Sequence, residues 1–190
     1  MGVIHDFNRD LSLWINKNIA PNIDVVEGED FCYYYHKQVV QYALLHNEKT
    51  DNNFLQFFDE YGLNYSAISP FVISLLHELG HAVTMSSFTE KEYEEDEQIK
   101  RNMVIPHSTI DSNYWYWELP IEFAANMWAI NWANEHFNEV TELSALCDEY
   151  LSRIENDENV MEQLNDWLEE VAEGEYTPLY IYEEDCDNEC

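Results

Sequence analysis

The sequence is most constrained by one short apolar segment that carries three ionisable side chains. Ser69 and Pro70 precede the run Phe-Val-Ile-Ser-Leu-Leu, and serine at the N-cap with proline at the first helical position is a strong signal for the start of a helix. The sequence therefore predicts a buried helix over 70–85. The motif His-Glu-Leu-Gly-His at 77–81 lies within it. Charged groups are costly inside a buried helix unless a ligand or a partner satisfies them.

The spacing of the two histidines suits a shared metal ion. Residues four apart lie on one face of a helix, so the imidazoles of His77 and His81 can point at one cation. Glu78 is turned about 100° from His77 around the helix, and its carboxylate can reach a water molecule on the metal without binding the metal itself. Two imidazoles and one carboxylate suit Zn²⁺, which lowers the pKa of its water to about 7. The motif predicts a hydrolytic zinc site with Glu78 as the general base.

The third ligand is expected from a second helix. Pro120 is tolerated in a first helical turn and predicts a helix over 120–136 that includes Glu122. Alanines follow Glu122 at three, seven and eleven residues, and such small side chains let two helices approach closely. Glu122 is therefore favoured as the third ligand, and Glu118, outside the helix, is its main competitor. The remaining candidates are Glu135, His107 and His136.

A second segment accompanies the histidine motif, and it reads Glu-Phe-Ala-Ala-Asn-Met-Trp-Ala over 122–129. Together with residues 77–81, it resembles the ImmA/IrrE family of zinc metallopeptidases, in which a HExGH helix is paired with a helix of the form E-x-x-A-N-x-F-A. The resemblance implies a minimal zincin-like metallopeptidase domain. It also implies that His77, His81 and Glu122 bind zinc and that Glu78 is the base. The family is associated with phages, other mobile elements and stress responses, so a protein regulator is the implied substrate.

The rest of the chain predicts an α+β, mostly helical fold with one small sheet and C-terminal helices. We expect one domain over 1–182, with its core in 23–136 and a C-terminal helical region over 137–172, followed by a disordered acidic tail over 183–190. Residues 86–117 are expected to be less regular. Two or three short strands are predicted between 23 and 45 and an edge strand over 177–182. The further predicted helices are 6–19, 53–61, 139–154 and 160–172.

The charge of the chain restricts its partners. Only 8 Lys and Arg residues stand against 39 Asp and Glu, a net charge of −31, yet 46% of the residues are hydrophobic and can form a core. This field repels phosphate backbones and anionic lipid surfaces, so we expect no direct nucleic-acid or membrane binding and a basic protein or peptide as partner. A second hypothesis is an acidic interaction protein, a DNA mimic or antirestriction-type inhibitor, in which the histidine motif is structural or a relic.

The remaining features concern the cysteines, membrane spans and further candidate residues of the site. The four cysteines show no zinc-ribbon or disulfide spacing and no apolar run reaches the roughly 18 residues of a membrane span, so we expect a soluble cytoplasmic protein with reduced thiols. Asn126 is a candidate for orienting a ligand. Candidates for stabilising a substrate oxyanion are Tyr114, Tyr116 and His107, and candidates for lining a substrate groove are Trp115, Trp117, Trp128 and Trp132.

Overall fold

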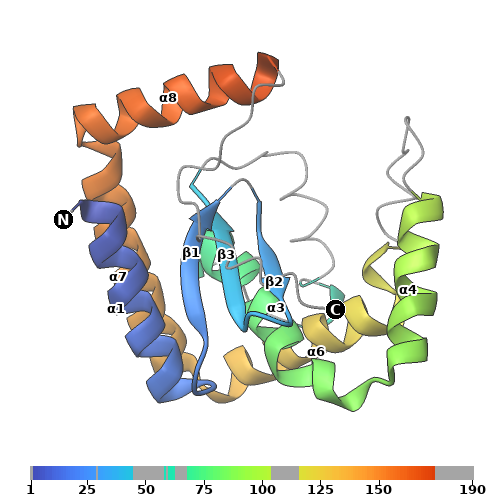
Figure 1. The fold of residues 1–190 in the computed structure, drawn as a ribbon. Coiled ribbons are helices and arrows are strands. Elements are labelled where there is room, and N and C mark those ends of the chain that lie inside the picture. The colour runs from blue at the N-terminus through green and yellow to red at the C-terminus, as the bar shows by residue number, and fades with distance from the viewer. Residues whose placement is uncertain are drawn as a thin grey trace.

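Helices dominate the structure, a computed structural model that describes residues 2–28, 30–44, 58, 60–62, 68–103 and 116–173. The expected α+β, mostly helical class is confirmed. Figure 1 shows three short strands with helices on either side of them. The elements are α1 (Val3–Asn18), β1 (Asp24–Gly28), β2 (Cys32–Tyr34), β3 (Val39–Ala43), α3 (Pro70–Thr84), the 3₁₀ turn η2 (Met85–Ser87), α4 (Glu90–Met103), α6 (Pro120–Glu135), α7 (Phe137–Glu155) and α8 (Glu158–Glu173).

The described sheet has three strands in the order β1-β3-β2. The central strand β3 is parallel to β1, with Val25 opposite Val40, and antiparallel to β2, with Tyr33 opposite Val40. Strand β2 therefore lies at an edge of this sheet. Helix α3 packs against β2 and β3, and α1 packs against β1.

The first described helix, α1, packs against α7, which lies far along the chain (Figure 1). Phe7 of α1 stacks on Tyr150 of α7 with ring centroids 5.1 Å apart, and the Tyr150 hydroxyl donates a hydrogen bond to Asp10 Oδ2 at 2.5 Å. The core joins these helices to the sheet and to α3. Fully buried members of this core include Phe7, Leu11, Val40, Tyr42, Ile73, Leu76, Leu143 and Cys147.

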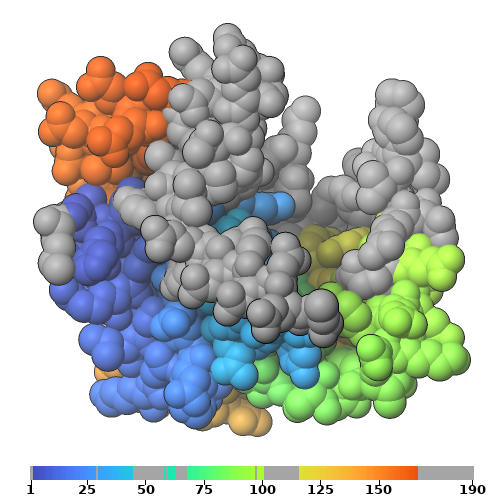
Figure 2. Space-filling view, viewed as in Figure 1, coloured from blue at the N-terminus to red at the C-terminus, as the bar shows by residue number. Residues whose placement is uncertain are grey.

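The structure differs from the sequence-based expectation between residues 86 and 117, where α4 is a regular helix. Its start is stabilised by a reciprocal cap, because the Thr89 hydroxyl accepts from the Glu92 N–H at 3.3 Å and the Glu92 carboxylate accepts from the Thr89 N–H at 2.8 Å. An ion pair between Lys91 and Glu95 at 2.8 Å adds support one turn on. Helix α4 lies at the periphery of the molecule, on the right in Figure 2.

The other predicted helices agree with the structure. The expected ranges 6–19, 70–85, 120–136, 139–154 and 160–172 correspond to α1, α3, α6, α7 and α8, with ends that agree within three residues. The strands fall inside the predicted region. Most of the predicted helix over 53–61, the edge strand over 177–182 and the tail over 183–190 lie outside the described residues. Among the described helices, none combines the length and apolar character needed to cross a membrane.

Candidate metal centre

Helix α3 is a buried helix that presents three ionisable side chains. Its N-terminus forms as predicted, with the Ser69 hydroxyl accepting from the Val72 N–H at 3.3 Å and Pro70 in the first turn. Every residue from Phe71 to Gly80 is buried, including His77 and Glu78. Because burial penalises charge without a partner, these side chains require partners from a neighbouring element.

The neighbouring element is α6, and Gly80 lets it approach. A Cβ atom added at Gly80 would lie 2.4 Å from the carbonyl oxygen of Ala125, so only glycine fits against this part of the α6 backbone. Ala125 and Ala129 are fully buried. The small residues of both helices therefore bring Glu122, one turn before Ala125, next to the histidines of α3.

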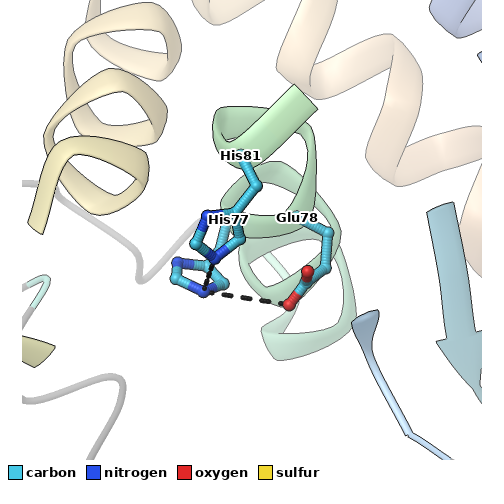
Figure 3. Close-up of side chains that lie close together, drawn as sticks. All are labelled: His77, Glu78 and His81. Atoms are coloured by element: carbon cyan, nitrogen blue, oxygen red, sulfur yellow. Dashed lines mark hydrogen bonds and ion pairs between the residues drawn. The ribbon is translucent and has the colours of Figure 1, made fainter. Parts of the chain in front are cut away.

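Three metal-binding atoms converge where the helices meet. The Nε2 atoms of His77 and His81 lie 3.1 Å apart, and Glu122 Oε2 lies 3.1 Å from the first and 3.3 Å from the second. Figure 3 shows both imidazoles on one side of α3 with the Glu78 carboxylate beside them, its Oε1 atom 3.8 Å from His77 Nε2. His77, Glu78 and His81 form a group that could hold a metal ion.

The orientation of the His77 ring is fixed from α6. Its Nδ1 atom lies 2.7 Å from the side-chain oxygen of Asn126, so Nδ1 carries the hydrogen and donates it. The Nε2 atom of the same ring lies next to His81 Nε2 and Glu122 Oε2. Asn126 is fully buried on α6, so the ring is held between the two helices.

The spacing of the three donor atoms fits a tetrahedral metal ion. Ligands that bind zinc at about 2.0–2.1 Å with tetrahedral angles lie about 3.3 Å from one another, and the three separations here are 3.1, 3.1 and 3.3 Å. Glu122 Oε2 is buried, and its polar neighbours among the described residues include the two imidazole nitrogens. A cation at this point would be bound by all three atoms.

The other oxygen of Glu122 is held by residues that the sequence-based prediction did not assign to this carboxylate. Lys100 Nζ lies 2.7 Å from Oε1, and the Tyr116 hydroxyl donates to the same atom at 3.2 Å. Lys100 also contacts Asp96 Oδ2 at 3.1 Å, and Asp96 Oδ1 lies 3.5 Å from the Ile121 N–H at the start of α6. Asp96 and Lys100 are one turn apart on α4, so this helix is attached to α6 beside Glu122.

Burial and the neighbouring charges shift the pKa values of the site in opposite directions. Burial raises the pKa of Glu78, and the imidazoles of His77 and His81 oppose this only in part. Burial also acts against ionisation of Glu122, but the two imidazoles outweigh it and hold the pKa of Glu122 well below its usual range. The environments of the two carboxylates therefore shift their pKa values in opposite directions.

The described competitors for the role of third ligand lie away from the two imidazoles. Glu118 is exposed in the turn before α6, and Glu135 is exposed at the far end of that helix. The ring of His136 stacks on Trp132, and its Nδ1 atom lies 3.0 Å from the Trp132 carbonyl oxygen. His107 is outside the described residues. Of the candidates that can be compared, Glu122 alone approaches both imidazoles.

Two of the predicted oxyanion and groove residues lie at the site. The ring of Trp117 is perpendicular to that of His77 with centroids 5.6 Å apart, whereas Tyr116 uses its hydroxyl on Glu122. Trp128 and Trp132 stack on each other, with Trp132 also contacting Trp14. Tyr114 and Trp115 lie outside the described residues.

Strand β2 borders the site, which sequence reasoning did not show. Burial raises the pKa of the Cys32 thiol on β2 to about 11, and the Glu78 carboxylate is the next largest cause. Helix α3, which carries Glu78, packs against β2. The edge strand of the described sheet therefore borders the helix of the base candidate.

Comparisons of the whole chain with protein-family models, with curated proteins and with solved structures find no match.

Proposed function

We propose that the chain is a zinc-dependent metallopeptidase that hydrolyses a peptide bond in a protein substrate. The observation that supports this most strongly is the convergence of His77 Nε2, His81 Nε2 and Glu122 Oε2 within 3.1–3.3 Å of one another. A buried carboxylate, Glu78, lies next to them. Three protein ligands with a neighbouring base are the arrangement of catalytic rather than structural zinc sites.

Glu122 is better placed than Glu78 to act as the third ligand. The approach of Glu78 to His77 Nε2 is 3.8 Å, whereas Glu122 Oε2 is 3.1 Å from the same atom and 3.3 Å from the second imidazole. Adjacent helical residues point in different directions, so Glu78 is directed less closely than His77 at the point where the imidazoles and Glu122 meet. We assign His77, His81 and Glu122 as ligands and Glu78 as the general base.

In this proposal, each residue of the site has a separate role in hydrolysis. Zinc bound at the site would lower the pKa of a water molecule to about 7 and polarise the substrate carbonyl. Glu78 accepts the proton of the attacking water, and its raised pKa suits a group that must take up and release a proton near neutral pH. The C–N bond then breaks, and Glu78 passes the proton to the leaving amine. Asn126 keeps the His77 ring in its binding orientation.

The substrate is proposed to be an extended, basic segment of a protein. Strand β2 is at the edge of the described sheet and borders the helix that carries Glu78, and a sheet edge can pair with a substrate strand through main-chain hydrogen bonds. The net charge of −31 attracts basic partners. Together with the resemblance to ImmA/IrrE proteins, this favours a regulator of a phage or mobile element as the protein that is cut.

Metal content tests the proposal before a substrate is known. Protein purified without chelators is expected to contain about one zinc per chain, and Glu122→Gln is expected to lose it. The matched control is Glu118→Gln, because Glu118 is exposed four residues earlier and its variant should keep the metal. Chains that take up no zinc would refute the proposal.

Catalysis is tested with the base variant. Glu78→Gln should retain zinc but lose cleavage of a mixed library of fluorogenic peptides by about 10²–10⁴-fold, the usual contribution of a general base. The exposed Glu94→Gln on α4 is the control. Unchanged cleavage by Glu78→Gln would show that this carboxylate is not the base.

A second function, an acidic interaction protein that occupies a basic DNA-binding partner, is favoured by the surface of α4. Its side chains at Glu90, Glu92, Glu94 and Glu95 are all exposed, so they are available to a partner. This function predicts competition with DNA that neither a chelator nor His77→Ala alters. The peptidase predicts that both treatments abolish cleavage.

A further inference from the structure

Helix α4 is attached to the rest of the molecule mainly through polar side chains. Among its side chains that the structure describes, at 90–96 and 98–100, Asp96 is buried, Lys100 is half-buried and the others are exposed. An amphipathic helix normally docks through an apolar stripe. Here Asp96 and Lys100, one turn apart, reach the N-terminal end of α6.

Lys100 and Tyr116 both contact the Glu122 carboxylate. Lys100 Nζ lies 2.7 Å from Glu122 Oε1 and 3.1 Å from Asp96 Oδ2, with the Tyr116 ring centroid 5.8 Å away. The Tyr116 hydroxyl donates to the same Glu122 oxygen at 3.2 Å. A charged donor and a neutral donor therefore share Oε1, and charge-assisted hydrogen bonds of this length are among the strong ones.

This arrangement leaves a single oxygen of Glu122 for a metal. Oε2 is the atom that lies 3.1 and 3.3 Å from the two imidazole nitrogens, while Oε1 already accepts two donors on the side away from them. A carboxylate held in this way coordinates through one oxygen, because turning it to use both would break the contacts with Lys100 and Tyr116.

We propose that Lys100 is a positioning residue of the metal centre that makes Glu122 a one-oxygen ligand and thereby keeps a coordination position open. The proposal rests on the metal site proposed above. It adds that the acidic helix α4 is part of the metal-binding unit, although no residue of α4 is a ligand. Hydrogen-bond partners of ligating groups typically change metal affinity by about 10–100-fold when they are removed.

The test measures metal binding rather than activity. Lys100→Met keeps the length of the side chain and removes the charge, and Lys100→Arg restores a charged donor. Lys91→Met is the matched control, because Lys91 lies on the same helix, is exposed and pairs only with the exposed Glu95 among the described contacts. The measurements are the zinc dissociation constant, by competition with a chromophoric chelator, and the visible spectrum of the cobalt(II)-loaded protein.

We expect Lys100→Met to bind zinc about 10–100-fold more weakly. Its cobalt bands should also lose intensity, because a two-oxygen Glu122 raises the coordination number above four. Lys91→Met should match the wild type, and Lys100→Arg should recover most of the affinity. If Lys100→Met does not fold, Lys100→Gln replaces it with the same expectations.

Two outcomes separate this inference from the proposed function. A wild-type protein that binds zinc tightly, with a Lys100 variant of equal affinity and an unchanged cobalt spectrum, would overturn the role of Lys100 and leave the metal site intact. A wild-type protein that binds neither zinc nor cobalt would overturn the metal site itself, and the role of Lys100 with it.

Discussion

Gly80→Ala is the substitution that tests most directly how α3 and α6 form the site. The added methyl group would lie 2.4 Å from the Ala125 carbonyl oxygen and 2.9 Å from its Cα. Unstrained contacts of this kind are about 3.4 Å or longer, so the helices must separate locally by about 1 Å. Alanine favours a helix over glycine by about 1 kcal/mol, but overpacking costs about 1–3 kcal/mol. The net effect on the free energy of unfolding is a loss of about 0–2 kcal/mol.

The effect on metal binding should be larger than the effect on stability. Glu122 is one turn from Ala125, and a shift of about 1 Å exceeds the roughly 0.2 Å tolerance of a metal-ligand distance. We expect zinc affinity to fall at least about tenfold, measured by chelator competition, while circular dichroism remains helical. The control is Gly2→Ala, where an added Cβ meets nothing within 4 Å. Wild-type zinc affinity in Gly80→Ala would refute the close packing of the two helices at this point.

Three further predictions concern the orientation of His77, a buried carboxylate of the sheet and the metal itself. Asn126→Ala removes the acceptor for His77 Nδ1 and should weaken zinc binding by about 10–100-fold in the same competition assay; an unchanged affinity would contradict the orienting role. Burial raises the pKa of Glu27 from 4.5 to about 7, so the unfolded chain loses this proton at a lower pH than the native state does. The free energy of unfolding therefore falls as the pH rises between these two values. Glu27→Gln should therefore be more stable than the wild type by about 3 kcal/mol at pH 8 and equal to it near pH 4, as urea unfolding at the two pH values would show. A chelator should lower the melting temperature by about 5–10 °C, because zinc at 100 times its dissociation constant contributes about 2.7 kcal/mol; a melting curve unaffected by EDTA and by added zinc would count against the site.

The parts of the site that could be predicted are those encoded in short segments. The cap formed by Ser69 and Pro70 located α3, and Pro120 located α6. The spacing of His77 and His81 was enough to place both rings on one face, and the alanines after Glu122 indicated which side of α6 approaches another helix. These signals are local, since each depends on residues within a few turns of one another.

The parts that could not be predicted depend on contacts between distant elements. Lys100 and Glu122 are 22 residues apart on different helices, and neither periodicity nor capping relates such residues. The parallel pairing of β1 with β3 is similar, because alternation of apolar residues identifies a strand but not its neighbour. Helix α4 is a different case. Thr89 and Glu92 form a capping box that can be recognised in the sequence, but the acidic run that follows favoured an irregular segment over a helix.

The pairing of α1 with α7 has a consequence for how the protein is made. Phe7 and Leu11 leave the ribosome more than 100 residues before the end of the helix that covers them, which lies at Glu155. Until then, the first helix of the nascent chain has an apolar face without its final partner, and contacts that span most of a chain are slow to form. Synthesis that stops after α6 would leave the apolar face of α1 without α7, and chaperones that recognise apolar helices would have most opportunity to bind during that interval.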